Sequence, residues 1–208
     1  SLGEGVATLP FLGPYIVAPT AIKYGASDSQ KEKLFADMSQ NLINFGIGFS
    51  EYFGSRDSSG LNISDNKVTG KTLFVLDTDF ASHVMIADNK GQIGIVSLDS
   101  NDIEIIDLTT VDKTRTYKEM HFSDTPIEIL DKTKSSSFAI EMALDAGRII
   151  AAADSLGASQ AMINKAVEYS KERKQFNRVI GSFQAVKHMC AEMAAELEPC
   201  YSLVWHAA

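Results

Sequence analysis

The sequence has 208 residues, 45% of them hydrophobic, which is enough for the core of one large domain or two small ones. Its 27 acidic residues outnumber its 19 basic ones, so the formal net charge is -8. Such a chain lacks the broad basic surface on which nonspecific nucleic-acid binding depends. No apolar run is long enough to span a bilayer, and the first residues do not follow the order of a signal peptide. We therefore expect a cytoplasmic protein with no nucleic-acid or membrane partner.

The cysteines and histidines indicate neither a disulfide nor a metal site. Cys190 and Cys200 would lie about 15 Å apart along one helix, beyond the reach of a disulfide. The four histidines are dispersed along the chain without the paired spacing of zinc ligands. We therefore predict reduced thiols and no metal.

The first part of the chain, residues 9–44, has helical spacing of its apolar residues. Leu34 and Met38 recur four residues apart, as they would on one face of a helix. The segment from Gly25 to Asp28 interrupts this pattern and supplies an N-cap for a helix that begins near Ser29.

From Ile43 to about Leu130 the hydrophobic period changes to two, which is typical of strands separated by polar turns. Such short strands predict an antiparallel sheet that closes into a barrel or stacks as a sandwich. A β-sandwich without any site is the alternative. The predicted strands are Asn44–Ser50, Val68–Leu76, His83–Ala87, Gln92–Leu98, Ile103–Ile106, Thr116–Phe122 and Ile127–Leu130.

After a polar linker, a long apolar stripe predicts a helix from Phe138 to Lys171. A turn rich in Asn and Gly follows, with Asn177-Arg178 and Gly181, and a second helix begins near Phe183. The predicted fold class is α+β, with three parts. These are the helical end of an N-terminal domain (1–43), a β-barrel or sandwich domain (44–131) and an incomplete C-terminal helical bundle (132–208).

The turn between the two late helices carries a concentration of positive charge. Lys171, Arg173, Lys174 and Arg178 lie within eight residues of each other. Arginine presents a planar fork of donors that suits phosphate. Charge alone is also explained by a solvated helix end, where cations offset the negative end of the helix dipole.

The residues around this turn resemble the signature of the acyl-CoA dehydrogenases, Tyr-x-x-x-Arg-x-Gln-Phe followed by Val-Ile or Pro-Ile and then Phe-Gln. The matching residues are Tyr169, Arg173, Gln175, Phe176, Val179-Ile180 and Phe183-Gln184. Asn177 stands where the family usually has Gly, and Asn tolerates left-handed backbone better than most residues. The chain resembles a divergent branch of this family, because Phe74 to Asp77 and Asp112 to Arg115 are similar to segments found there.

The resemblance implies an FAD site. Ser50-Glu51 and Gly54-Ser55 resemble the family loop whose hydroxyls and amides contact the flavin and the acyl-CoA. The strand behind the flavin ring would contain Phe74 and Val75, and because Val75 has no side-chain donor, a backbone amide would have to serve there. From the turn, the residues implied to reach the FAD of a neighbouring subunit are Arg173, Gln175, Phe176 and Gln184.

The resemblance also implies an acyl-CoA substrate site that includes Ser55, Asp145 and Arg148. Arg148 is flanked by apolar residues, so it needs an anionic or carbonyl partner. That partner would be the substrate, or Asp145 or Asp154 for purely structural reasons.

No residue of the sequence is assigned as the catalytic base. Most members of the family supply a Glu from a late loop, which would lie beyond Ala208, and others place it at the position of Gly147. We therefore expect the chain to be a fragment of a longer protein, inactive by itself.

Two functions remain open at this point. The first is an FAD-dependent acyl-CoA dehydrogenase that works as a dimer or tetramer and passes electrons to an acceptor protein in fatty acid β-oxidation. The second is a non-catalytic partner subunit or degenerate paralogue, which would use the same turn only for assembly.

Overall fold

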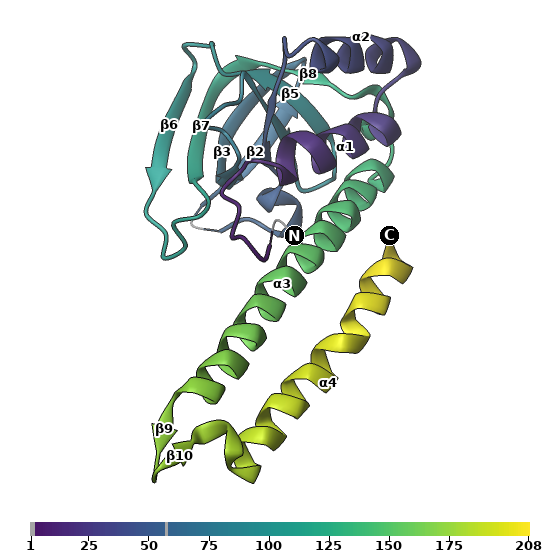
Figure 1. Cartoon of the computed structure of the whole chain (residues 1–208). Coiled ribbons are helices and arrows are strands. Elements are labelled where there is room, and N and C mark those ends of the chain that lie inside the picture. The colour runs from purple at the N-terminus through teal and green to yellow at the C-terminus, as the bar shows by residue number, and fades with distance from the viewer. Residues whose placement is uncertain (1–2, 57) are drawn as a thin grey trace. The chain divides into compact units, whose positions relative to one another are not determined.

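A computed structural model describes residues 3–56 and 58–208. The chain divides into two compact units (Figure 1). The sheet unit comprises residues 8–147, and the hairpin unit comprises residues 3–7 together with 148–208. The predicted α+β class is confirmed, while the domain boundaries expected after residues 43 and 131 stay predictions.

Three helical segments open the sheet unit: a π-helical turn η1 (Gly13–Val17), α1 (Ala18–Gly25) and α2 (Asp28–Ser39). Ser27 is the N-cap of α2, and its backbone N–H donates to the Oε1 of Gln30 at 3.1 Å, as in a capping box. The Nε2 of Gln30 donates to the carbonyl of Ile129 at 2.9 Å. The cap that begins α2 therefore also fastens this helix to the end of the sheet.

All seven predicted strands are present, and an eighth joins them in a single sheet (Figure 1). Along the sheet the order is β6-β7-β3-β1-β4-β5-β8, and β2 pairs with β3. The strands are β1 (Phe45–Gly48), β2 (Gly60–Ser64), β3 (Lys67–Leu76), β4 (His83–Ala87), β5 (Ile93–Ser97), β6 (Ile103–Leu108), β7 (Tyr117–Pro126) and β8 (Glu128–Ile129).

The predicted closed barrel is wrong, because within the described residues the sheet is open between β6 and β8. The expectation of purely antiparallel pairing is also wrong. β1 lies between β3 and β4 and pairs antiparallel with β3 but parallel with β4. After β3 the chain passes to the other side of β1, and β4 runs opposite to β3. It is therefore parallel to β1.

Strand β2 was not predicted, because Gly60 and the polar residues of this short segment weaken the apolar alternation. It forms a hairpin with β3 through Asp65 and Asn66, whose φ angles are 51° and 57°. Two consecutive left-handed residues are what a two-residue hairpin turn requires, and Asp and Asn adopt them readily.

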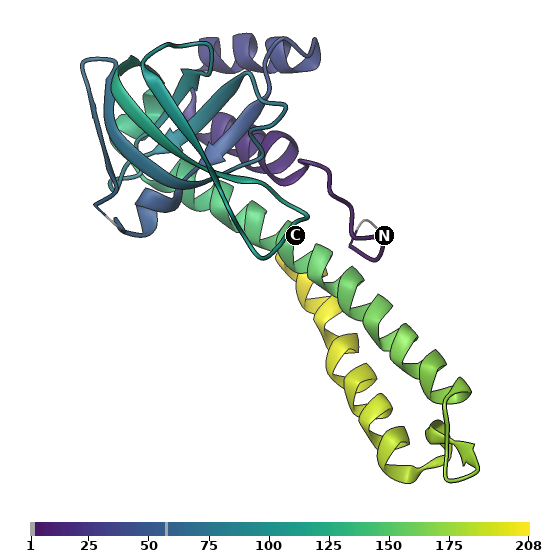
Figure 2. The same cartoon turned by 90° about the vertical axis from the view of Figure 1, so that its left-hand side faces the viewer.

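Hydrophobic residues are buried on both faces of the sheet. One core lies under α1 and the start of the long helix α3 (Phe138–Glu172) and includes Phe45, Met85 and Ile140. The other includes Ile86 and Met120 and gathers residues from β3, β7, β4 and β5. Figure 2 shows the sheet curving, which lets strands far apart in its order share one core.

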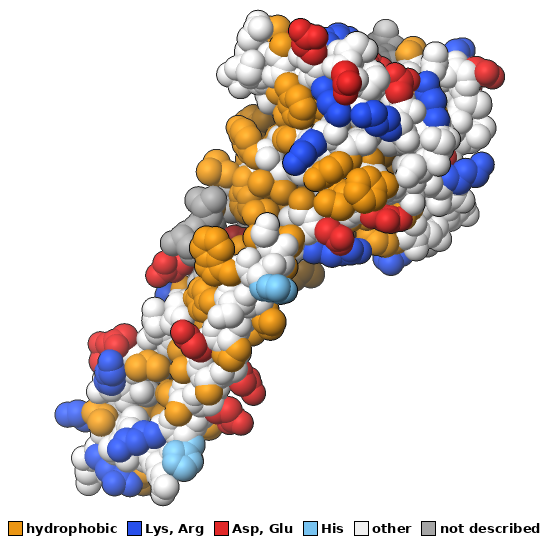
Figure 3. Space-filling view, turned by 90° about the vertical axis from the view of Figure 1, so that its right-hand side faces the viewer, with side chains coloured by type: hydrophobic (Ala, Val, Ile, Leu, Met, Phe, Trp, Pro, Cys, Tyr) orange, Lys and Arg blue, Asp and Glu red, His pale blue; other side chains and the backbone are white. Residues whose placement is uncertain are grey.

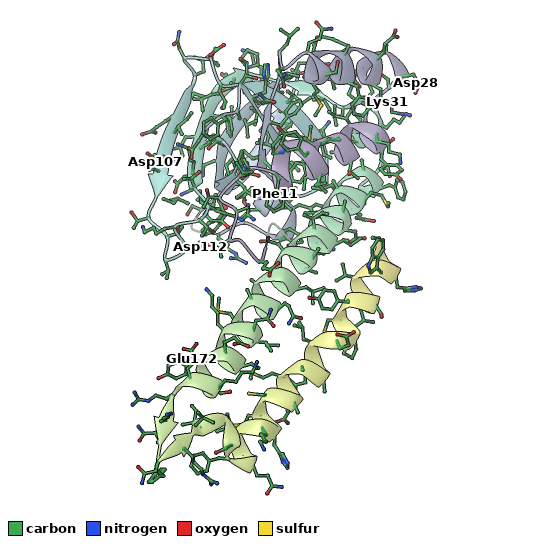
Figure 4. The ribbon with its side chains drawn as sticks, viewed as in Figure 1. Phe11, Asp28, Lys31, Asp107, Asp112 and Glu172 are labelled. Carbon is green, nitrogen blue, oxygen red and sulfur yellow. The ribbon has the colours of Figure 1, made fainter. Side chains whose placement is uncertain are left out.

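The hairpin unit is built by two antiparallel helices (Figures 1 and 2). They are the C-terminal part of α3, which ends at Glu172 (labelled in Figure 4), and α4 (Gln184–Ala207). The short strands β9 (Lys174–Gln175) and β10 (Arg178–Val179) and a 3-10 turn, η4 (Ile180–Ser182), connect them. A similar turn, η3 (Asp131–Lys134), lies in the predicted linker before α3.

The predicted turn between the helices is confirmed, and its geometry centres on Phe176 and Asn177, at φ 51° and 59°. Asn177 thus adopts the left-handed backbone for which Gly is the usual residue. Gly181 has a different role, because a Cβ there would lie 2.9 Å from the carbonyl oxygen of Ser170. It allows the connection to pass close to the end of α3.

Within the described residues, no helix is both long enough and apolar enough to cross a membrane.

Asp77 is a buried carboxylate at the end of β3, and its Oδ2 accepts the backbone N–H of Gly13 at 2.8 Å. Burial raises the pKa of Asp77 above its ordinary value of 3.8, although Gly13 and the positive charge of Arg115 oppose this. The guanidinium of Arg115 lies 5.0 Å from the ring centre of Phe11, which is labelled in Figure 4. Asp77 thus anchors the start of η1 to β3 at an electrostatic cost.

We predict that Asp77→Asn becomes increasingly stabilising, relative to the unchanged protein, as the pH rises above 3.8. A carboxyl with a raised folded-state pKa binds protons more tightly when folded, so its contribution to the free energy of unfolding falls as pH increases through that window. Asn keeps an acceptor for the Gly13 amide but carries no charge. Urea unfolding of both proteins between pH 3.5 and 8 measures the difference.

Asp79 provides the matched control, because a hydrogen bond from Thr116 and the positive charge of Lys118 lower its pKa. Asp79→Asn should therefore show the opposite sign, with its change falling mainly below pH 3.8, and little pH dependence over most of the range in which Asp77→Asn gains stability. If the difference in unfolding free energy between Asp77→Asn and the unchanged protein does not depend on pH, burial does not raise the pKa of Asp77.

Candidate functional site

The loop after β1 is folded around the peptide groups of Leu73. It forms a short 3-10 turn, η2 (Ser50–Phe53), that ends at Gly54 with φ 120°. The Ser50 hydroxyl donates to the carbonyl oxygen of Leu73 at 2.6 Å, and the Leu73 N–H donates to Oε1 of Glu51 at 3.3 Å. Two consecutive side chains thus hold both backbone groups of one residue of β3.

Glu51 is buried to 1% exposure, although it carries a carboxylate. Its Oε2 accepts the hydroxyl of Ser59 at 2.7 Å, and the Oγ of Ser59 accepts the N–H of Arg56 at 2.8 Å. Glu51 is not among the predicted site residues, and full burial is rare for a charged side chain. Its place beside Ser50 in the family-like loop was the only signal.

Phe74 lies on a bulge of β3, where the pairing with β7 shifts between Thr72 and Val75. Its φ is 55°, and its ring is 46% exposed. Val75, in contrast, is fully buried in the core shared with β4 and β7. The side chain at position 74, and not the one at 75, therefore faces outward beside the loop.

The loop and the bulge enclose a cavity of about 130 Å³. Of the predicted flavin contacts in the sheet unit, Ser50, Gly54 and Phe74 line it, whereas the exposed Ser55 does not. The Ser50 hydroxyl has its hydrogen directed at Leu73, so it offers a ligand mainly an acceptor. The complete lining is Ser50, Glu51, Phe53, Gly54, Arg56, Leu73 and Phe74.

The hairpin unit presents the second predicted group, Arg173, Gln175, Phe176 and Gln184, all exposed. Within the described part of the chain the Arg173 guanidinium has no hydrogen-bond or ion-pair partner. Phe176 is 87% exposed, and its ring centre lies 6.1 Å from that of Phe183. Figure 3 shows Lys and Arg side chains gathered at this end of the two helices.

Two neighbours of Arg173 have partners of their own. Lys171 pairs with Glu168 at 2.6 Å, and the Arg178 guanidinium lies 4.0 Å from the ring centre of Phe183. Arg178 is thus held by a cation-π contact. Among the described residues Arg173 has neither kind of partner, so its guanidinium is the least restrained of these three cations.

On α3, Asp145 and Arg148 are exposed and three residues apart. Gly147 is buried, and a Cβ at this position would lie 3.2 Å from Cγ2 of Val17. A side chain there would require Val17 to shift by a few tenths of an ångström. Nearby, Glu141 accepts hydrogen bonds from the hydroxyls of Tyr52, at 3.1 Å, and Ser137, at 2.7 Å, so it is held by the loop and the helix start.

Metal ligation has no support in residues 3–56 and 58–208, since no three His, Cys, Asp or Glu side chains gather there in a way that could hold a metal ion.

Residues 138–208 match the acyl-CoA dehydrogenase C-terminal domain. Over its whole length the chain is 26% identical to the 3-(aryl)acrylate reductase of Clostridium sporogenes, of which it covers 60%. Over 67% of its length it is 31% identical to the caffeyl-CoA reductase-Etf complex subunit CarC of Acetobacterium woodii, of which it covers 33%.

Among solved structures, butyryl-CoA dehydrogenase from Megasphaera elsdenii has the same fold, with a TM-score of 0.82. The sequences are 22% identical, and the match covers 96% of this chain and 57% of that one. Together these matches support an acyl-CoA dehydrogenase family member, as the residues around Arg173 indicated. It spans 60% or less of the length of each of these proteins.

We predict that Phe74→Gly costs less than about 1 kcal/mol of stability, although it removes a large ring. Left-handed backbone costs a residue with a Cβ roughly 1–2 kcal/mol, and Gly avoids this cost. Val75→Ala, at the neighbouring buried position, should cost about 2 kcal/mol by leaving a cavity. Urea unfolding of the two variants is the measurement, and an equal loss in both would contradict the strained, outward geometry of Phe74.

Proposed function

We propose that this chain provides part of an FAD-dependent acyl-CoA dehydrogenase, which introduces a double bond between the α and β carbons of an acyl-CoA thioester. The observation that carries the proposal is the exposed β9–β10 connection, with Arg173 free to bind an anion. The resemblance of the segment with Arg173, Gln175 and Gln184 to the acyl-CoA dehydrogenase signature implies FAD as the ligand there.

The exposed groups of the hairpin unit fit the dinucleotide part of FAD. A guanidinium binds a phosphate through two parallel charge-assisted hydrogen bonds, and the amides of Gln175 and Gln184 can donate and accept. We assign these side chains to the FAD of a neighbouring subunit, so the active protein would be a homo-oligomer. Phe176 would cover the ligand with its exposed ring.

The cavity in the sheet unit fits an aromatic ring edge. Phe74 offers a ring face, Gly54 allows close approach of backbone, and Ser50 offers an oxygen lone pair. Bound here, FAD would supply the acceptor for the hydride that leaves the β-carbon. Ser55 and the backbone of Val75 stay assigned to the same region as part of the proposal.

Asp145 and Arg148 are the proposed contacts for the acyl-CoA. Each is proposed by itself: the Arg148 guanidinium suits a phosphate or thioester oxygen, and the Asp145 carboxylate suits a hydrogen-bond donor. No catalytic base is assigned, because the only alternative position within the chain is the tightly packed Gly147.

An electron-transfer protein is the proposed partner for reoxidising the flavin, as the name of the caffeyl-CoA reductase-Etf complex subunit suggests for that relative. Two relatives are named as reductases of unsaturated acids or thioesters. The same flavin chemistry runs in either direction, so the proposed reaction at the α and β carbons includes the reduction of enoyl-CoA substrates.

A non-catalytic partner or degenerate paralogue is the second candidate. Two observations favour it: Gly147 carries no carboxylate at the alternative base position, and the Ser50 hydroxyl is bonded within the protein. Two measurements on the whole gene product separate the candidates: a titration with FAD, and an assay of dye reduction with acyl-CoA. Yellow protein that reduces a dye with acyl-CoA excludes the second, and colourless protein that ignores FAD contradicts the first.

We predict that Arg173→Lys weakens FAD binding about tenfold and Arg173→Gln weakens it further. Lysine keeps the charge but loses the planar pair of donors, and about 1.4 kcal/mol corresponds to a factor of ten. Flavin fluorescence titration measures the dissociation constant.

The matched control for this prediction is Lys174→Gln, which removes an exposed charge one residue away. It should change FAD affinity less than either Arg173 variant. If Lys174→Gln and Arg173→Gln weaken binding equally, general charge attraction explains the effect, and the assignment of Arg173 is wrong.

A further inference from the structure

Glu51 is a buried carboxylate that the proposed chemistry does not use. Within the described residues its hydrogen bonds come from the Ser59 hydroxyl and the backbone N–H of Leu73, and no ion pair with a cation accompanies them. A buried charge without a counterion is costly unless its oxygens are well satisfied. Here the carboxylate is held by groups that belong to the two walls of the cavity.

One wall is the η2 loop, which Glu51 closes on itself. The Ser59 hydroxyl donates to Glu51 while accepting the Arg56 N–H, and the Ser59 N–H donates to the Arg56 carbonyl at 2.7 Å. Both ends of the segment that carries Gly54 are thereby connected to one carboxylate.

The other wall is the bulge of β3. Glu51 accepts the N–H of Leu73, Ser50 donates to its carbonyl, and Phe74 follows at once with φ 55°. A left-handed Phe in a strand persists only where surrounding contacts fix it. The hydrogen bonds to the N–H and the carbonyl of Leu73 provide that constraint. They keep Phe74 on the bulge, with its ring at the cavity.

We propose that Glu51 is a positioning residue for the flavin ring: it fixes the Gly54 loop and the Phe74 bulge relative to each other, and so shapes the cavity between them. This inference rests on the proposed function for its ligand. The inference also has a local half, which needs no ligand: Glu51 holds the backbone N–H of Leu73 in place.

The test uses Glu51→Ala, Glu51→Gln and Ser59→Ala in the whole chain. Gln preserves the shape and one acceptor oxygen for the Leu73 amide, so it should retain more of the arrangement than Ala. If Glu51→Ala fails to fold, Glu51→Gln and Ser59→Ala carry the test.

Thr133→Ala is the matched control in the same unit. Thr133 is 3% exposed, and its hydroxyl accepts the N–H of Ile93 at 3.0 Å and donates to the carbonyl of Leu130 at 2.7 Å. It therefore belongs to a buried hydrogen-bond network of similar size, but it does not line the cavity. Its loss should destabilise the unit without affecting a flavin.

The first readout is hydrogen exchange of the FAD-free protein. Glu51→Ala should increase exchange of the Leu73 amide, whereas Thr133→Ala should increase exchange at Ile93 and leave Leu73 unchanged. Unchanged protection of Leu73 in Glu51→Ala would overturn the local half of the inference.

The second readout is the dissociation constant and visible absorption spectrum of bound FAD. Glu51→Ala should weaken binding about tenfold and shift the flavin bands, Glu51→Gln should lie between it and the unchanged protein, and Thr133→Ala should alter neither. Normal affinity and spectrum in Glu51→Ala, with a deprotected Leu73, would overturn the positioning role while leaving the proposed function intact. If the unchanged protein binds no FAD, the proposed function fails and the flavin part of this inference fails with it, whereas the exchange result still decides the local part.

Discussion

The two hydrogen bonds that fix the peptide groups of Leu73 connect the local structure to the proposed chemistry. Ser50 and Glu51 are adjacent in sequence, yet one binds the carbonyl and the other the N–H of the same residue of β3. The regular pairing of β3 with β7 is interrupted at this point, and Phe74 turns outward. Without these contacts nothing in the strand itself would favour a left-handed aromatic residue.

The second constraint is the turn between α3 and α4. Two left-handed residues, Phe176 and Asn177, reverse the chain, and Gly181 lets it pass against Ser170. This turn leaves Arg173 exposed while Lys171 and Arg178 bind neighbours within the hairpin unit. The distribution of partners explains why one guanidinium among several cations is the proposed phosphate ligand.

Much of the fold could be predicted from the sequence, because local periodicity reports local structure. The alternation of apolar residues predicted seven strands, and the helical stripe predicted α3 to within one residue of its end at Glu172. The order of the strands could not be predicted in this way, because the position of β1 between β3 and β4 depends on pairings distant in sequence. The sheet is open, whereas the short strands had suggested a closed barrel or a two-layered sandwich.

The site residues stay predictions, but the structure shows what the motif could and could not indicate about their surroundings. Ser50, Gly54 and Phe74 line one cavity, but the sequence gives no sign that the Ser50 hydroxyl is already bonded or that Val75 faces the core. Glu51 was overlooked because a charged side chain is expected at the surface. The Leu73 amide and the Ser59 hydroxyl, which it meets only after folding, explain its burial.

We propose that FAD binds between copies of this chain, through Arg173 and its neighbours. The most direct measurement is FAD affinity as a function of protein concentration, with the mass of the flavin-bound species determined by analytical ultracentrifugation. We expect affinity to increase as the protein self-associates and the flavin to sediment only with a dimer or larger species. A flavin-bound monomer, or an associated protein that binds no flavin, would contradict it.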